Sequence, residues 1–268
     1  MSRIELRNVT KLFGRNQAAA MELARQGVDK MEILQRTGCS LGLNDVSLEI
    51  PTNEIFVLMG LSGSGKSTLV RHLNRLIEPS SGAILFEGDD ITRYDAQALR
   101  EFRRRSVSMV FQGFGLLPHR TVLQNVAFGL ITRGETQREA YPKAMQWIET
   151  VGLKGYETKM PSQLSGGMRQ RVGLARALTV DSNVILMDEA FSALDPLIRF
   201  EMQDLLLELQ RTFKKTIVFV THDLDEAVRI GARIAVMKNG RLVQVGTPAT
   251  ILANPADDYV ARFVQRRT

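Results

Sequence analysis

The 268-residue chain predicts an α/β fold built on a mainly parallel core sheet, and three observations carry that prediction. First, the apolar run at 54–59 leads into a glycine-rich turn, and apolar residues then recur at helical spacing at Leu69, Val70, Leu73, Leu76 and Ile77. Second, two short apolar runs at 184–187 and 216–220 indicate strands buried on both faces. Third, residues 121–160 carry only helix and turn signals. We therefore expect a helical subdomain, over about residues 113–172, inserted into an α/β sheet.

The N-terminal region predicts a strand that is followed by an insertion. Residues 4–9 alternate apolar with polar, and the same alternation resumes at Val46, Leu48 and Ile50. Between them lies a helical stretch in which Asp29 is a plausible N-cap and Gly38 a plausible stop. We interpret residues 16–40 as a helical insertion between two strands.

Later elements follow the same logic. A capping box at Thr136 and Glu139 begins a helix that Pro142 is expected to kink. Another helix begins at Asp195, where Pro196 takes the first helical position. Further strands are predicted at 83–86, 107–111, 233–237 and 242–245, a helix at 95–105, and a short helical tail over residues 246–268.

The glycine-rich turn matches the phosphate-binding pattern G-x-x-x-x-G-K-[ST]. Its backbone N–H groups can wrap a phosphate chain, and the following helix adds its partial positive charge. Lys66 would reach the β- and γ-phosphates, and the Ser67 hydroxyl would ligate Mg²⁺. A chance match in a chain of this length is on the order of one in a hundred. The candidate nucleotide-binding residues of this turn are Gly60, Ser62, Gly63, Ser64, Gly65, Lys66, Ser67 and Thr68.

Two carboxylates, Asp188 and Glu189, follow the buried run at 184–187. The carboxyl edge of an open α/β sheet is where ligand chemistry gathers, and two buried acids without a partner are costly, so a cation is implied there. Phe13, at the end of the first strand, is either a core aromatic or a platform for an adenine ring. The loop after Gln112 brackets apolar residues with glycines and a proline, which indicates a loop that meets a partner.

Composition narrows the function classes. No apolar run approaches the roughly 18 residues that cross a bilayer and no signal peptide begins the chain, so we expect a cytosolic protein unless a partner holds it to a membrane. The single cysteine, Cys39, excludes an internal disulfide and is expected to be a small buried hydrophobe, and three scattered histidines give no metal cluster. The net charge of +6 raises nucleic acid as a ligand, but no basic motif is interleaved with aromatics, so none is expected.

Taken in order, these segments resemble the ATP-binding subunit of ABC transporters over essentially the whole chain. The matching motifs are Walker A at 60–67, the Q-loop at Gln112, the signature at 164–168, Walker B at 184–188 followed by Glu189, the D-loop at 192–195 and the switch histidine His222. The resemblance implies one P-loop ABC-type domain over residues 1–268, with a mainly parallel core sheet, an antiparallel β subdomain and the inserted helical subdomain. It also implies ATP and Mg²⁺ as the bound groups.

The same resemblance supplies residue roles. Asp188 would hold Mg²⁺, mostly through water, Glu189 would act as general base or position the attacking water, and Gln112 would touch the metal or that water. His222 would donate to the γ-phosphate, unless it only caps the following helix. Ser165, Gly166 and Gly167 would meet the nucleotide of a second copy in a head-to-tail dimer, and Asp195 of the D-loop would also bind nucleotide. Asp195 is an N-cap in either case.

Two residues depart from the family pattern: Met168 replaces the usual Gln of the signature, and Ala190 replaces the usual Pro. With the insertion and the run at 187–199, they are similar to the glycine betaine/proline branch of importers. The branch implies a peripheral subunit on the cytoplasmic face of the bacterial plasma membrane, driving a permease fed by an extracytoplasmic binding protein. Many of its members add a pair of CBS domains; residues 246–268 read as a short helical tail and not as such a pair, and whether one follows in a longer protein is left open.

The function expected from the resemblance is ATP hydrolysis that energises uptake of an osmoprotectant such as glycine betaine, choline or proline. The alternative is a soluble ABC ATPase of DNA repair or translation. Only about a hundred residues separate Walker A from the signature, without the heptads of a coiled coil, and there is one cassette, which disfavours that alternative. A P-loop small-molecule kinase would leave residues 164–168 unexplained. The solute itself is not encoded in this chain.

Overall fold

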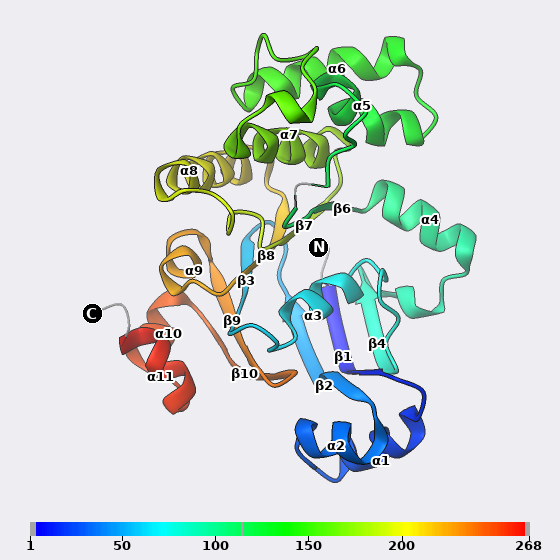
Figure 1. Ribbon diagram of the computed structural model, residues 1–268, viewed down its shortest axis with the longest axis vertical. Helices are drawn as coiled ribbons and strands as arrows, with labels where there is room; N and C mark the ends of the chain where they lie inside the picture. Colours follow the sequence, from blue (N-terminus) through cyan, green and yellow to red (C-terminus); the bar gives the residue numbers. More distant parts are fainter. Residues whose placement is uncertain (1–3, 114, 266–268) are drawn as a thin grey trace. The chain divides into compact units, whose positions relative to one another are not determined.

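The computed structural model describes residues 4–113 and 115–265 (Figure 1). Its contacts divide the chain into two compact units: the first holds residues up to 99 and from 220 onward, and the second holds residues 100–219. The mixture of parallel and antiparallel sheets with covering helices confirms the predicted α/β class. The predicted domain boundaries stay a prediction. Phe114 and residues 266–268, which fall in the predicted partner-facing loop and tail, lie outside the described residues.

The first unit contains an antiparallel sheet of order β2-β1-β4-β5 and the strand series β10-β9-β3. Strand β3 runs parallel to β9, and β9 is antiparallel to β10. Every residue of β3 is buried, as its unbroken apolar run predicts. The strands of this unit are β1 (Ile4–Phe13), β2 (Ser40–Ile50), β3 (Ile55–Met59), β4 (Ser81–Phe86), β5 (Asp89–Asp90), β9 (Arg233–Lys238) and β10 (Arg241–Gly246).

The predicted insertion forms two helices between β1 and β2. The Asp29 carboxylate accepts a hydrogen bond from the Met31 N–H and caps the second helix, and Gly38 ends it at φ +70°. Ile33, Cys39 and Leu12 pack together here in one fully buried cluster. The helices of this unit are α1 (Gln17–Arg25), α2 (Lys30–Thr37), α3 (Lys66–His72), a 3-10 turn η1 (Ile91–Arg93), α9 (Leu224–Ile230), α10 (Pro248–Ala253) and α11 (Asp258–Gln265). Helix α4 (Ala96–Arg105) joins the two units in sequence.

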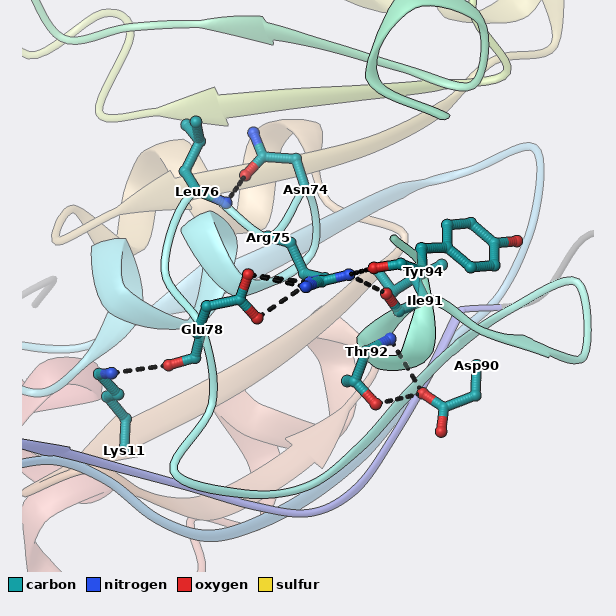
Figure 2. Close-up of polar contacts among 9 residues, drawn as sticks. All are labelled: Lys11, Asn74, Arg75, Leu76, Glu78, Asp90, Ile91, Thr92 and Tyr94. Atoms are coloured by element: carbon teal, nitrogen blue, oxygen red, sulfur yellow. Dashed lines mark hydrogen bonds and ion pairs between the residues drawn. The ribbon is translucent and has the colours of Figure 1, made fainter. Parts of the chain in front are cut away.

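Helix α3 is shorter than its apolar spacing predicts, because it ends at His72 and leaves Leu76 half-exposed. Arg75 takes a left-handed backbone conformation, φ +50°, that an α-helix cannot continue through. As Figure 2 shows, its guanidinium donates to the Ile91 and Tyr94 carbonyls at 2.7 and 2.8 Å and pairs with Glu78 at 2.9 Å. These tertiary hydrogen bonds outweigh the local helical spacing.

The second unit combines strands β6 (Val107–Val110), β7 (Val184–Asp188) and most of β8 (Thr216–Thr221) with a helical part. Strand β6 runs parallel to β7, and β7 is entirely buried. The helical part is built from α5, α6 and α7, which share one apolar cluster (Figure 1). Helix α6 runs without interruption through Pro142 and starts at the predicted Thr136–Glu139 capping box. The helices of this unit are α5 (Val122–Thr132), α6 (Gln137–Thr150), a 3-10 turn η2 (Pro161–Gln163), α7 (Gly166–Thr179) and α8 (Pro196–Phe213).

Candidate functional site

The glycine-rich turn joins the buried strand β3 to helix α3, as the sequence predicts. Gly65 is the residue before the first helical position and has φ +104°. A Cβ atom there would lie 2.7 Å from the Gly42 carbonyl oxygen. Only glycine satisfies both the backbone conformation and the close approach, so the conformation of the turn depends on this residue.

Two polar side chains of this turn, Lys66 and Ser64, show whether it can bind a phosphate chain. Lys66 is 3% exposed, and its Nζ donates to the Leu61 carbonyl oxygen at 3.1 Å. The Ser64 hydroxyl is buried and has no hydrogen-bond partner among the described residues. The Lys66 ammonium is buried in the same loop that would surround a phosphate chain, and the Ser64 hydroxyl of that loop is free to donate. Both groups are donors suited to an anion. The residues therefore fit a phosphate group.

Tyr259, on helix α11, links the phosphate loop to strand β9 through its hydroxyl group. Its hydroxyl accepts from the Leu61 N–H at 3.1 Å and donates to the Met237 carbonyl at 3.1 Å. Burial raises the pKa of this phenol, so it stays neutral and keeps its proton to donate. The sequence analysis did not predict a role for Tyr259. Its one signal there was that this short amphipathic helix carries an aromatic residue with a hydroxyl group.

Phe13 ends strand β1 and is 41% exposed, so the interpretation as a core aromatic is wrong. The Lys11 ammonium lies 5.1 Å from the centroid of its ring. Its other predicted role, as a platform for a base, stays a prediction.

The second unit holds the carboxylates. Asp188 ends β7 and is 3% exposed, and Glu189 follows it at φ +48°. The Gln112 Nε2 donates to Glu189 Oε2 at 3.1 Å, so two of the predicted site residues touch although 77 positions separate them. The Ser192 N–H and hydroxyl both lie within hydrogen-bond distance of the Glu189 carbonyl oxygen, at 3.2 and 2.9 Å. Glu189 is thus fixed at both its backbone and its side chain.

The signature and D-loop segments begin adjacent helices of this unit. Ser165 caps α7 by accepting from the Met168 N–H at 3.2 Å, and Asp195 caps α8 by accepting from the Ile198 N–H at 3.1 Å. A Cβ atom at Gly167 would lie 2.6 Å from the Ile198 Cγ2 atom, so the two helix starts pack against each other at a glycine. Met168, the departure in the signature, packs on the apolar cluster of α5–α7, which gives its side chain a structural place.

His222 is exposed just after strand β8. The N-cap of α9 is Asp223, whose carboxylate accepts from the Asp225 and Glu226 N–H groups at 2.9 and 3.2 Å. The alternative that His222 only caps this helix is therefore wrong, and its proposed role toward a phosphate stays open.

The candidate residues are divided between the two units. Phe13, the phosphate loop and His222 belong to the first, while Gln112, the signature, the two carboxylates and Asp195 belong to the second. Within residues 4–113 and 115–265 no group of three or more His, Cys, Asp or Glu side chains is placed to hold a metal ion. Over the same residues no helix is both long and apolar enough to cross a membrane.

Comparison with known proteins identifies the class. A parallel-sheet α/β fold with a phosphate loop defines a nucleotide-binding protein, and residues 43–192 match the family model described as ABC transporter. The chain belongs to the ABC transporter family.

Similar proteins within this family indicate to which members the chain is related. The chain is 55% identical over 98% of its length to the glycine betaine transport ATP-binding protein OpuAA of Bacillus subtilis and spans 63% of that protein. It is 56% identical over 97% of its length to the glycine betaine/proline betaine transport system ATP-binding protein ProV of Escherichia coli and spans 65% of it. The chain therefore spans just under two thirds of these relatives. Among solved structures, a dimeric ATP-binding cassette in a post-hydrolysis state, bound to ADP and Pi, matches with a TM-score of 0.77 and 30% identity, covering 91% of this chain and 98% of that one.

Proposed function

We propose that this chain is an ATP-hydrolysing subunit that energises import of an osmoprotectant-type solute through a membrane permease. One observation carries the proposal: a phosphate loop with a buried lysine and a spare buried hydroxyl, in a chain more than half identical to ATP-binding proteins of glycine betaine transport systems. The names of these relatives describe transport, and no feature of the described residues favours the alternative of DNA repair or translation.

In the proposed reaction a water molecule attacks the γ-phosphorus of ATP, and the bond to the β–γ bridging oxygen breaks to give ADP and phosphate. Lys66 and the turn N–H groups would bind the phosphates, and the Glu189 carboxylate would accept the proton of the water. Gln112 orients that carboxylate through the 3.1 Å hydrogen bond. Ser67, Asp188 and Gln112 would hold a Mg²⁺ ion, which supplies positive charge to the β- and γ-phosphates when bound. His222 would donate to the γ-phosphate.

We further infer that the active unit is a head-to-tail dimer. Ser165, Gly166 and Gly167 stand at the N-terminus of the 14-residue helix α7, where unpaired N–H groups and the helix dipole favour an anion. In the dimer this end would face the nucleotide of the second copy, with Asp195 beside it. Each copy would then supply half of each site.

The loop over residues 112–120 is the proposed contact with the permease, because it carries apolar residues beside Gln112. An extracytoplasmic binding protein would deliver the solute, and the chain would lie on the cytoplasmic face of the plasma membrane. Glycine betaine, choline, proline and related compounds are the proposed solutes.

Glu189→Gln tests the reaction. This variant should lose ATP turnover and, since the nucleotide cannot be cleaved, accumulate as an ATP-bound dimer in size-exclusion chromatography. Glu201→Gln on α8 is the matched control and should hydrolyse ATP as the wild type does. Turnover by Glu189→Gln at the wild-type rate would remove Glu189 from the proposed role. A variant that stays monomeric at saturating ATP should be measured again with permease present, which separates a wrong dimer model from a requirement for the permease.

The solute is tested with the neighbouring permease subunit co-purified and reconstituted. Uptake of glycine betaine, choline, proline and histidine is compared in the presence of ATP. Uptake of none of these, with ATP hydrolysis intact, would reject the solute class and leave the ATPase proposal standing.

A further inference from the structure

A cavity of about 360 Å³ adjoins the phosphate loop within the first unit. Gly63, Gly65 and Thr68 of the loop line one side of it. Phe13, Leu41 and two residues of the inserted helix α2, Met31 and Leu34, supply its large apolar side chains, and Lys30, Ser40 and Gly42 also line it. A nucleotide whose phosphates lie in the loop must place its base one ribose away from them. This cavity has the size of a small-ligand site and combines large apolar side chains with a few polar ones.

The Phe13 ring is held in place on its own side of the cavity. It packs against Gly42, where a Cβ atom would lie 2.7 Å from the ring Cε2 atom, so a larger residue at 42 would displace the ring. The Lys11 ammonium lies over the ring at 5.1 Å from its centroid. The same ammonium donates to the Glu78 carbonyl oxygen at 2.7 Å (Figure 2). The aromatic surface that borders the cavity is therefore positioned before any ligand arrives.

The Met31 and Leu34 side chains belong to helix α2, which is anchored at both ends and in its middle. Ile33 is fully buried in the cluster beneath α2, and the Asp29 cap and the left-handed Gly38 fix its two ends. Met31 and Leu34 are three positions apart, which places them on one face, and they remain 56% and 41% exposed. Two large apolar side chains that α2 keeps in water, lining the same cavity as an aromatic ring, indicate a site for a flat apolar group.

We propose that α2 forms the second wall of the nucleoside site, so that the base lies between Phe13 on one side and Met31 and Leu34 on the other. The inference rests on the proposed ATP binding and adds to it a role for the insertion. A methionine thioether and a leucine pack well on the face of a heteroaromatic ring. Contacts to the face of a base do not read its hydrogen-bonding edge, so the wall favours purines over pyrimidines by area and separates ATP from GTP little.

The test compares two ligands that share the phosphates but not the base: ATP and inorganic tripolyphosphate. Binding is measured by calorimetry on the whole chain for the wild type, for the double variant Met31→Ala/Leu34→Ala, and for Met145→Ala, a half-exposed methionine on α6. Loss of the two side chains should weaken ATP binding about tenfold and leave tripolyphosphate binding unchanged. Met145→Ala should change neither. Because both substituted side chains are exposed, the thermal unfolding temperature should stay close to that of the wild type.

Any other outcome would reject either the second wall or the proposed function, and the two can be told apart. Unchanged ATP affinity in the double variant overturns the second wall and leaves the proposed ATPase standing. Equal weakening of both ligands also overturns it, because the substitutions would then act through the phosphate loop. Lys66→Ala should weaken both ligands; if it weakens neither, or if the wild type binds no ATP, the proposed function itself fails.

Discussion

Asn125, buried in helix α5, offers a decisive perturbation of the loop that is proposed to meet the permease. Its side chain spans the end of that loop: the Leu117 N–H donates to Oδ1 at 2.8 Å, and Nδ2 donates to the carbonyls of Leu117, Arg120 and Thr121 at 3.1, 2.9 and 3.0 Å. The residue has no exposed surface. One amide therefore supplies most of the internal hydrogen bonds that this turn receives from a side chain.

The cost of Asn125→Ala follows from the groups left behind. The Thr121 carbonyl keeps the backbone hydrogen bond from the Asn125 N–H at 2.9 Å, so it is not left without a donor. The Leu117 carbonyl likewise keeps the Arg120 N–H at 3.2 Å, which leaves the Leu117 N–H and the Arg120 carbonyl as the groups that lose their partner. Both residues are partly exposed, so water can replace part of the loss. At about 1–3 kcal/mol for each buried group left unpaired, discounted for hydration, we expect a loss of about 3 kcal/mol in the free energy of unfolding.

Urea unfolding measures this loss through Trp147, the single tryptophan, which packs on Phe213 with ring centroids 4.9 Å apart in the same unit. Asn183→Ala, an exposed asparagine of that unit, is the control and should change stability by less than about 0.5 kcal/mol. ATP binding should be unchanged, while uptake with permease should fall. A loss below about 1 kcal/mol would show that water replaces the amide, and the argument that Asn125 holds the loop would fail.

Three further predictions concern the phosphate loop and its helix. Tyr259→Phe removes the hydroxyl between Leu61 and Met237, and we expect about 1 kcal/mol less stability and ATP binding weakened a few-fold in calorimetry; unchanged binding would show that the loop holds its form unaided. Burial lowers the pKa of His72, which stays neutral in the folded chain, whereas the unfolded chain takes up a proton below about pH 6.5. Stability should therefore fall as the pH drops from about 7 toward 5, and unfolding titrations of His72→Leu should show a shallower decline; equal slopes would contradict the assignment. Chelation of divalent cations should stop ATP hydrolysis, and added Mg²⁺ should restore it; turnover that persists in excess chelator would exclude the proposed metal.

Local chemistry was the part of the fold that the sequence predicted well. The Asp29 and Asp195 caps and the Thr136–Glu139 capping box each involve residues within one helical turn, so their pattern is complete in a short window. Helix α3 was overestimated for the opposite reason. Its end depends on hydrogen bonds from Arg75 to residues 16 and 19 positions away. A local periodic pattern cannot predict contacts between residues so far apart.

The same distinction applies to the candidate site. The motif order predicts which residues belong to it, but not how they are held. Tyr259 reaches Leu61 across 198 positions, and the insertion appears in the sequence only as an interruption between two strands. That Met31 and Leu34 border the phosphate loop depends on how α2 packs, which the buried Ile33 decides.

The positive φ of Glu189 connects the proposed chemistry with the proposed permease contact. A glutamate at φ +48° is in a sparsely populated conformation that persists only where its surroundings hold it, and such positions concentrate at functional sites. Here the holding groups are Ser192 at the backbone and Gln112 at the carboxylate. Gln112 lies on the segment between β6 and the turn that Asn125 closes, so a displacement of that turn by a partner acts on the residue that orients the carboxylate. We therefore expect movement of this turn to change how Gln112 orients the carboxylate of the proposed base.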